Sequence, residues 1–226
     1  MVKDMSGRRS YDDPCGVARA LDMVGERWAL LVVRELLLGP KRFTDLRLGL
    51  PTASQNVLSH RLRELEQAGV VRRRKLGPPA STWVYELTEH GYDLEPALLQ
   101  FARWGSRLPM TASAELSVDA LILALKTTFD PRIDGELRAI YELRLGEDRF
   151  RAEVADGRIE LVRGRGDQPD ATIETSVAIF RSLVFGCRPL ADALHCGDVT
   201  LEGDHHAVAR LLDLFPCPTP PPPVGA

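Results

Sequence analysis

Polar side chains able to hydrogen-bond to the flat edges of bases recur on one side of the stretch 52–66. The leucines at positions 58, 62 and 65 follow helical spacing, so at about 100° per residue they form one narrow apolar stripe. The opposite face then offers amide, hydroxyl, imidazole and guanidinium groups, which read base edges in a DNA groove: Gln55, Asn56, Ser59, His60 and Arg63. An ordinary surface helix with a solvated polar face has the same pattern, so its surroundings must decide.

The residues before this helix predict a second, shorter helix and a tight turn. Thr52 and Gln55 have the spacing of a capping box, which predicts that the longer helix begins at Thr52. The segment Phe43–Leu48 is typical of a short helix, and Gly49–Pro51 of a turn. Short helix, turn and longer helix together form the helix-turn-helix arrangement.

Two strand-like segments follow. Val70–Lys75 and Trp83–Leu87 flank a turn with Gly77–Pro79, which predicts a β-hairpin with a basic first strand. Four consecutive cations, Arg72–Lys75, are also typical of an edge strand kept soluble by charge. Beside a helix with a polar outer face, we favour the interpretation that the hairpin is a wing.

The net charge of −3 hides an asymmetry between the halves of the chain. Met1–Met110 holds 17 Lys and Arg against 13 Asp and Glu, whereas Thr111–Ala226 holds 12 against 19. Lys41–Lys75 alone contains nine basic and three acidic residues. This positive segment suits a polyanion such as double-stranded DNA, and the acidic second half suggests a separate role.

Apolar helices outside the small DNA-binding core predict a homodimer. The nearly all-apolar segment Trp28–Leu38 is expected to form the central helix. Outside it, Cys15–Val24 has helical spacing, and Thr88 is predicted to cap a helix kinked at Pro96. Their apolar faces exceed what a small winged domain needs to bury. The expected interface residues are Val17, Leu21, Leu94, Leu98, Phe101 and Trp104.

The second half predicts a sheet covered by helices. Alternating apolar and charged residues indicate three hairpin-linked antiparallel strands over 137–145, 149–154 and 158–162, with further strands at 171–175 and 199–202. One helix is expected to begin at Ser117, and further helices are expected over 176–185, 188–195 and 205–215. The fold class is therefore α+β: an N-terminal winged helix-turn-helix and a C-terminal antiparallel sheet covered by helices. The expected boundaries are a flexible arm (1–14), the winged domain (15–108), the sheet domain (115–216) and a Pro-rich tail (217–226).

Several protein classes lack support in the sequence. No stretch reaches the roughly 18–20 apolar residues of a membrane span, and no secretory signal begins the chain, so we expect a cytoplasmic protein. The four cysteines form no CxxC pair. Motifs of hydrolases, phosphate-binding loops and metalloproteases are missing, so we expect no enzyme and no cofactor. His195-Cys196 and His205-His206 fit no common zinc spacing, so no metal site is expected.

The first half resembles the HxlR family of bacterial winged helix-turn-helix transcriptional regulators. The resemblance extends over about Cys15–Gly105 and lies in four separated motifs: Cys15–Trp28, Arg34–Leu46, Ser54–Gly69 and Tyr85–Gly91. It implies a homodimer on a pseudo-palindromic operator, with Ser54–Gly69 in the major groove and the wing against the minor groove or backbone. Together with the charge pattern it gives these DNA-contact candidates: Lys41, Arg42, Thr52, Ser54, Gln55, Asn56, Ser59, His60, Arg61, Arg63, Arg72, Arg73, Arg74, Lys75, Ser81 and Thr82.

The second half, over about Asp119–Phe215, resembles sterol-carrier-protein type 2-like domains, above all at Gly197–Asp204. This resemblance implies an apolar tunnel for a hydrophobic small molecule, which would be the effector of the regulator. The same side chains also suit an ordinary core. The candidate lining residues are Phe129, Tyr141, Phe150, Phe180, Leu183, Val184, Phe185, Leu190 and Leu194.

Two alternatives stay open. Some members of the HxlR family sense oxidants or electrophiles through a cysteine at the place of Cys15, which precedes a helix here but has no cysteine close by in sequence. We favour a small buried helix-cap residue at this position. The other alternative is a lipid-carrier or enzymatic second domain, for which the winged domain is only a dimerising scaffold.

Overall fold

The computed structural model describes residues 10–108, 115–186 and 188–216, in two compact units, Met1–Leu94 and Glu95–Ala226. The expected Pro-rich tail and most of the expected arm lie outside these residues, as do Cys187 and Cys217. Ser10 and Tyr11 are described, and both donate hydrogen bonds to the carboxylate of Asp22 (3.0 Å each). Among the helices that the structure describes, none combines the length and the apolar character that a membrane span requires.

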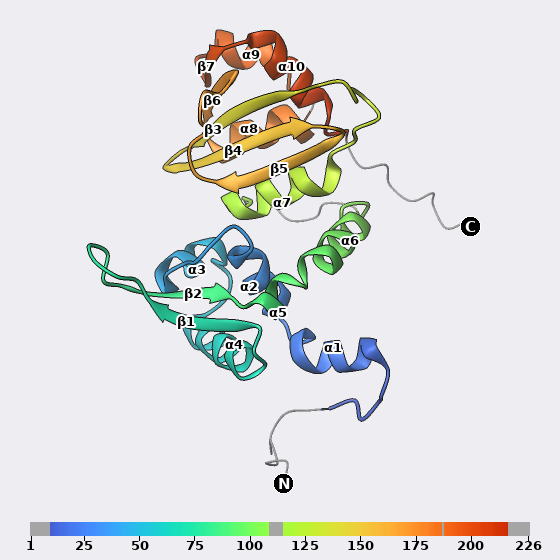
Figure 1. Ribbon diagram of the computed structural model, residues 1–226, viewed down its shortest axis with the longest axis vertical. Helices are drawn as coiled ribbons and strands as arrows, with labels where there is room; N and C mark the ends of the chain where they lie inside the picture. Colours follow the sequence, from blue (N-terminus) through green and yellow to red (C-terminus); the bar gives the residue numbers. More distant parts are fainter. Residues whose placement is uncertain (1–9, 109–114, 187, 217–226) are drawn as a thin grey trace. The chain divides into compact units, whose positions relative to one another are not determined.

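The first unit has the predicted order of elements (Figure 1). Its elements are α1 (Gly16–Val24), α2 (Ala29–Leu36), α3 (Phe43–Gly49), α4 (Gln55–Gln67), β1 (Val71–Lys75), β2 (Trp83–Leu87) and α5 (Glu89–Tyr92). The predicted leucine stripe of α4 is wholly buried, together with Val32 and Leu36 of α2 and Leu46 of α3. The helix-turn-helix and the hairpin are therefore confirmed as one packed unit.

Helix α4 begins later than predicted. Ser54, not Thr52, is its N-cap, and the Ser54 side chain accepts a hydrogen bond from the backbone N–H of Val57 (3.3 Å). Thr52 lies exposed in the preceding turn, so the capping box with Gln55 was wrong. Both residue types satisfy a helix N-terminus equally well, and the burial of Ala53 (6% exposed) holds the turn in place up to Ser54.

The hairpin pairs β1 and β2 antiparallel and is extended by one isolated bridge. In the bridge, Lys41 and Tyr85 exchange backbone hydrogen bonds of 2.9 and 2.8 Å. The segment between α2 and α3 thus supports β2 on the side away from β1. Sequence periodicity gave no sign of this bridge, because a single paired residue has no alternation.

The expected kinked helix after Thr88 is two helices. Thr88 caps α5 as predicted, accepting a hydrogen bond from Gly91 N–H (3.0 Å), but α5 ends at Tyr92 and α6 (Glu95–Gly105) starts anew. Pro96 lies in the first turn of α6, where its missing N–H costs nothing. Helix α6 belongs to the second unit, whereas it was expected in the winged domain.

The second unit is a five-stranded sheet with helices (Figure 1). After α6 its elements are α7 (Val118–Thr128), β3 (Ala139–Leu145), β4 (Asp148–Ala155), β5 (Arg158–Arg163), β6 (Ala171–Thr175), α8 (Val177–Phe185), α9 (Leu190–His195), β7 (Val199–Gly203) and α10 (His205–Asp213). The strand order is β5-β4-β3-β6-β7, and β3 pairs with β6 in parallel. The expected purely antiparallel sheet is thus wrong at this pair, while every other pair is antiparallel.

One face of this sheet is apolar and the other charged. Tyr141 on β3 and Phe150 on β4 are wholly buried, whereas alternate positions carry ion pairs. Among these, the Glu142 carboxylate accepts hydrogen bonds from Arg144 (3.1 Å) and Arg149 (2.9 Å). This alternation confirms the predicted covered and wet faces.

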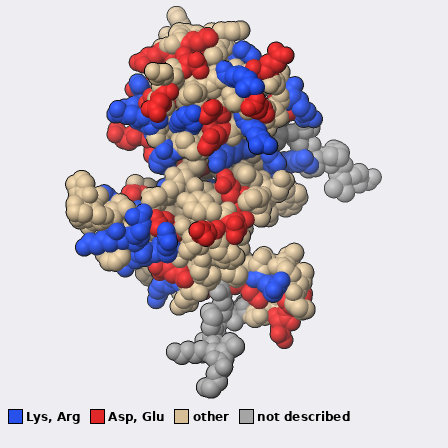
Figure 2. Space-filling model, viewed as in Figure 1, with Lys and Arg blue, Asp and Glu red and all other residues tan. Residues whose placement is uncertain are grey.

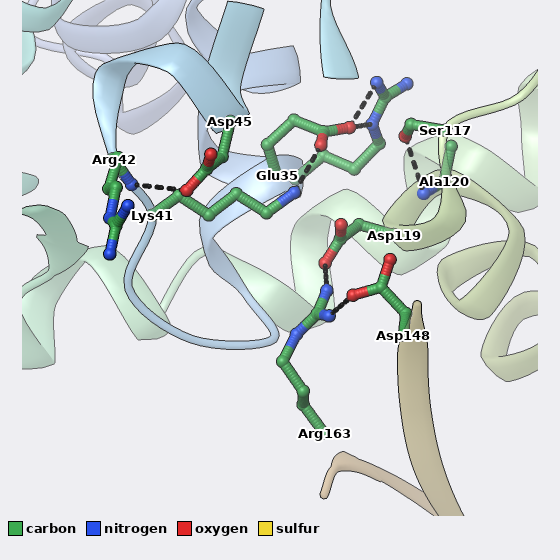
Figure 3. Close-up of polar contacts among 10 residues, drawn as sticks. Glu35, Lys41, Arg42, Asp45, Ser117, Asp119, Ala120, Asp148 and Arg163 are labelled. Atoms are coloured by element: carbon green, nitrogen blue, oxygen red, sulfur yellow. Dashed lines mark hydrogen bonds and ion pairs between the residues drawn. The ribbon is translucent and has the colours of Figure 1, made fainter. Parts of the chain in front are cut away.

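Ionic and hydrogen-bonded contacts join the helices to the sheet. The Asp119 side chain on α7 is wholly buried and pairs with Arg163 of β5 (2.8 Å), which also pairs with Asp148 (Figure 3). The Tyr141 hydroxyl donates to the carbonyl oxygen of Ala207 in α10 (2.9 Å), and burial raises the pKa of Tyr141 to about 12. These contacts fix α7 and α10 against the apolar face.

Candidate nucleic-acid interface

The outer face of α4 presents the predicted polar groups to solvent. Gln55, Asn56, His60 and Arg63 are exposed, and Ser59 is half-buried among them. His60 Nε2 lies 3.3 Å from Glu64 Oε1, and Arg63 Nε donates to the Ser59 carbonyl oxygen (3.3 Å). Among the described residues, both side chains are therefore held by groups on the helix itself, and both can turn to a ligand in front of it.

Arg61 was expected on this face, and the structure places it elsewhere. Its side chain is turned toward the core of the unit and the residue is only 8% exposed. The guanidinium contacts Glu26, the carbonyl oxygen of Arg27 and Glu64. Position 61 lies beside the apolar stripe of α4, so its side chain is directed toward the core. Arg61 is therefore not a candidate DNA contact.

The two candidate DNA contacts between α2 and α3 also differ, because one side chain is exposed and the other is paired inside the unit. Arg42 is exposed, and its backbone N–H donates to Asp45 (3.1 Å) at the start of α3 (Figure 3). The Lys41 side chain is 13% exposed, and its Nζ pairs with Glu35 (2.7 Å). Lys41 thus belongs to an internal ion pair, whereas Arg42 lies on the surface.

The register of the hairpin places the cations of the wing on its two faces. Figure 2 shows a group of Lys and Arg side chains over the wing. Arg72 and Arg74 lie on one face and share the carboxylate of Glu86, at 2.8 Å and 2.7 Å. Hydrogen bonds from Arg74, and from Arg72, hold the pKa of the Glu86 carboxyl below its ordinary value. Glu86 therefore orders two guanidinium groups and cancels one of their charges.

The other face combines a cation with aromatic rings. The Arg73 guanidinium lies 4.6 Å from the ring centre of Trp83 and 6.0 Å from that of Tyr85. Trp83 is 49% exposed, so the stacked pair stays accessible. Lys75 and Ser81 are exposed farther along the hairpin, and Thr82 is half-buried.

Sequence reasoning missed Glu86 and Trp83 as parts of this interface. The hairpin register was the available signal, because it places Arg72 opposite Glu86 and Arg73 opposite Tyr85. Cross-strand pairs of opposite charge or of cation and ring follow from such a register. Without a known turn length the register was open, and so were the partners.

Replacing Glu86 with Gln is expected to strengthen non-specific DNA binding and to steepen its salt dependence by up to about one unit of slope. The substitution removes the carboxylate that pairs with Arg72 and Arg74 while keeping hydrogen-bond acceptance by the side chain. Fluorescence anisotropy with a random duplex, measured over a series of salt concentrations, gives this slope. Glu89→Gln, exposed just beyond β2, is the control, and an equal change in both variants would contradict the assignment.

The candidate dimer residues are mostly exposed. Val17 (68%) and Leu21 (41%) lie on α1, and Phe101 (59%) and Trp104 (61%) stack on α6 with their ring centres 5.9 Å apart. Leu98 differs, because it is buried (7% exposed) within the chain. Leu94 is half-buried just before α6. Each helix thus presents large apolar side chains to solvent.

The candidate ligand residues lie between the sheet and its helices. Tyr141, Phe150 and Phe180 are wholly buried, Leu183 and Val184 nearly so, and the rest are half-buried: Phe129, Phe185, Leu190 and Leu194. Helix α8 supplies three of the buried side chains and lies behind the sheet in Figure 1. The structure brings most of these residues into one apolar layer.

Cys15 occupies the N-cap position of α1, as expected, but it is exposed, so the prediction of a buried residue was wrong. Its backbone N–H donates to the carboxylate of Asp13 (2.8 Å). Within the residues that the structure describes, no group of three or more His, Cys, Asp and Glu side chains could hold a metal ion.

Comparison with known proteins gives consistent matches to the first half of the chain. A model of the family described as HxlR-like helix-turn-helix matches residues 23–112. The uncharacterised HTH-type transcriptional regulator YvaP of Bacillus subtilis is 39% identical over 88 residues, which are 39% of this chain and 82% of YvaP. The HTH-type transcriptional regulator YodB of B. subtilis is 35% identical over 88 residues, which are 39% of this chain and 79% of YodB.

Solved structures match the same part. The redox regulator HypR in its oxidised form is 35% identical with a TM-score of 0.40, and the match covers 43% of this chain and 100% of HypR. Quinone-bound YodB from B. subtilis is 33% identical with a TM-score of 0.36, and the match covers 41% of this chain and 97% of that one. The family match ends at residue 112, so the sheet of the second unit lies beyond it.

Proposed function

Because the chain belongs to the HxlR family of helix-turn-helix transcriptional regulators, we propose that it binds operator DNA as a homodimer through α4 and the β1–β2 wing. The observation that carries this proposal is the combination of two neighbouring surfaces. Helix α4 presents hydrogen-bonding side chains that suit base edges, and the wing presents ordered cations that suit phosphates. Arg63 and Asn56 are assigned to base edges, and Arg73 and Arg42 are assigned to the phosphate backbone of the DNA.

The dimer is proposed from the exposed apolar residues of α1 and α6. Large apolar side chains grouped on a helix surface are typical of protein interfaces. Two copies related by a twofold axis would present two α4 helices to successive major grooves, which suits a pseudo-palindromic operator. Size-exclusion chromatography with light scattering tests this; a monomer at micromolar concentration would contradict it.

We further propose that a hydrophobic small molecule in the second unit modulates operator affinity. Its support is the resemblance to sterol-carrier-like domains together with the apolar layer around Phe150 and Phe180. An effector acts only if it binds the DNA-competent and DNA-incompetent arrangements with different affinity. Native mass spectrometry of the purified protein identifies any bound molecule.

The test of the whole proposal uses DNA upstream of the protein's own gene. Specific binding is expected to weaken steeply as salt rises, because several cations contact phosphates. Adding each molecule released from the second unit should change this affinity. Binding that is absent, or insensitive to salt, would favour a lipid-carrier or enzymatic second unit on a dimerising scaffold; binding that no released molecule changes would remove the effector.

A second candidate function is redox or electrophile sensing at Cys15, and its exposure at the start of α1 favours it. Cys15→Ser should then abolish the loss of DNA binding on treatment with hydrogen peroxide. Gel-shift titration measures the response, and Cys196→Ser is the matched control, since Cys196 is an exposed thiol in the second unit. An unchanged response in Cys15→Ser would rule this candidate out.

A further inference from the structure

Arg61 joins the candidate recognition helix to the turn that follows α1. Its Nε donates to the carbonyl oxygen of Arg27 (3.1 Å), and its Nη2 lies 3.5 Å from Oε2 of Glu26. Its Nη1 donates to Glu64, one turn farther along α4. A single planar guanidinium therefore contacts a backbone oxygen and two carboxylates through three different nitrogens, whereas a lysine ammonium would have to reach all three from one nitrogen.

The direction of α1 depends on this turn. Only Ala18 and Val24 of its nine residues are buried, so α1 has little packing of its own within the described chain. The turn leads into α2 through Trp28, whose φ of 78° is left-handed, and the Arg27 guanidinium lies 5.0 Å from the centre of the Trp28 ring. A short turn in such an uncommon conformation needs support from its neighbours. Arg61 provides that support from α4.

We infer that Arg61 is a positioning residue that fixes the angle between α1 and α4 and thereby the half-site spacing that the dimer accepts. The inference rests on the proposed function, in which α1 joins the two copies and α4 enters the groove. A change in the direction of α1 moves the partner copy and its α4 together. Half-sites about 34–36 Å apart tolerate little such movement, because both helices must reach the same face of the duplex.

The experiment separates half-site binding from binding of the full operator. Wild-type protein selects its operator from a random duplex library, and the selected sequence provides duplexes with one half-site, with both, and with the spacing changed one base pair at a time. Arg61→Lys is expected to bind one half-site within about twofold of wild type. Its affinity for the full operator should fall at least about tenfold, because the two copies can no longer bind both half-sites at once without strain. Its preferred spacing between half-sites should also change.

Arg63→Lys is the matched control, because Arg63 lies two residues away on the exposed face. It should weaken the single half-site and the full operator while leaving the preferred spacing as in wild type. Glu26→Gln changes the same contact from its exposed end, since the Glu26 side chain is 58% exposed, and it should also change the preferred spacing. This variant keeps the inference testable if Arg61→Lys does not fold.

An unchanged spacing preference in both folded variants would overturn the inference. So would an equal loss on half-site and full operator in Arg61→Lys, which would make Arg61 a contact or a general support. A wild-type protein that selects no sequence would refute operator binding itself, and the inference with it. A wild-type protein that binds one half-site and the full operator with equal affinity would refute the dimer, and the inference with it, while leaving DNA binding by α4 in place.

Discussion

Replacing Glu35 with Ala is expected to lower the free energy of unfolding of the first unit by about 3–5 kcal/mol, because it removes one partner from a buried ion pair. The Glu35 side chain is fully buried in α2 and pairs with Arg34 and with Lys41, at 2.7 Å each. The pair with Lys41 is labelled in Figure 3. Without its carboxylate, the largely buried ammonium of Lys41 loses this anion. The close approach of Gly49 to the carboxylate shows how tightly the pocket is filled, since a Cβ there would lie 2.1 Å from Glu35 Oε2.

Hydrogen exchange on peptides from α2 and β2, followed over a urea series in the full-length protein, measures the unfolding of this unit. Asp93→Asn is the control, because Asp93 lies 3.9 Å from His90 in an exposed pair of the same unit. It should change the free energy of unfolding by less than about 0.5 kcal/mol. The change in the free energy of unfolding for Glu35→Gln should fall between those for Glu35→Ala and Asp93→Asn. A change for Glu35→Ala as small as that for Asp93→Asn would show that the ion pair of Glu35 contributes little to stability.

Replacing Arg63 and replacing Arg73 with Ala are expected to impair DNA binding in different ways. Arg63→Ala should reduce discrimination at one operator position by about 1–3 kcal/mol, because the side chain is assigned to a base edge. Arg73→Ala should weaken binding to all sequences alike and lower the salt slope by about one unit, because its stacked guanidinium is assigned to phosphate. Selection from a random library, with binding measured across a salt series, reports both quantities.

Arg158→Ala, exposed on β5 of the second unit, is the control for the loss of one positive charge. It should leave both the base preference and the salt slope as in wild type. Relaxed specificity in Arg73→Ala with uniform weakening in Arg63→Ala would mean that α4 does not lie in the groove as proposed.

Local patterns predicted most of the elements, because helix and strand periods are properties of a few consecutive residues. The leucine stripe predicted α4, and the alternation of 137–145 with 149–154 predicted the hairpin of β3 and β4. Ends were less certain, as at Thr52 and Ser54, where two residues of similar capping ability lie two positions apart. The burial of Ala53, a property of the folded unit, decided between them.

Partners distant in the sequence were the main omission. The charge pattern and the family resemblance assigned Arg61 and Lys41 to DNA, but each side chain pairs with a carboxylate that folding brings alongside. Glu86 became part of the interface for the same reason. The parallel pairing of β3 with β6 was missed for the same reason, because residue alternation predicts a strand but not the strand that pairs with it.

The central place of β3 has a consequence for the newly made chain. Its pairing with β4 needs only a short turn and the meander is complete at Arg163, but β6 is not available before Thr175 has been synthesised. Until then the second edge of β3 lacks its partner strand, and an apolar strand with an open edge attracts strands of other chains. Aggregation during expression is therefore expected to depend on how fast this interval is translated.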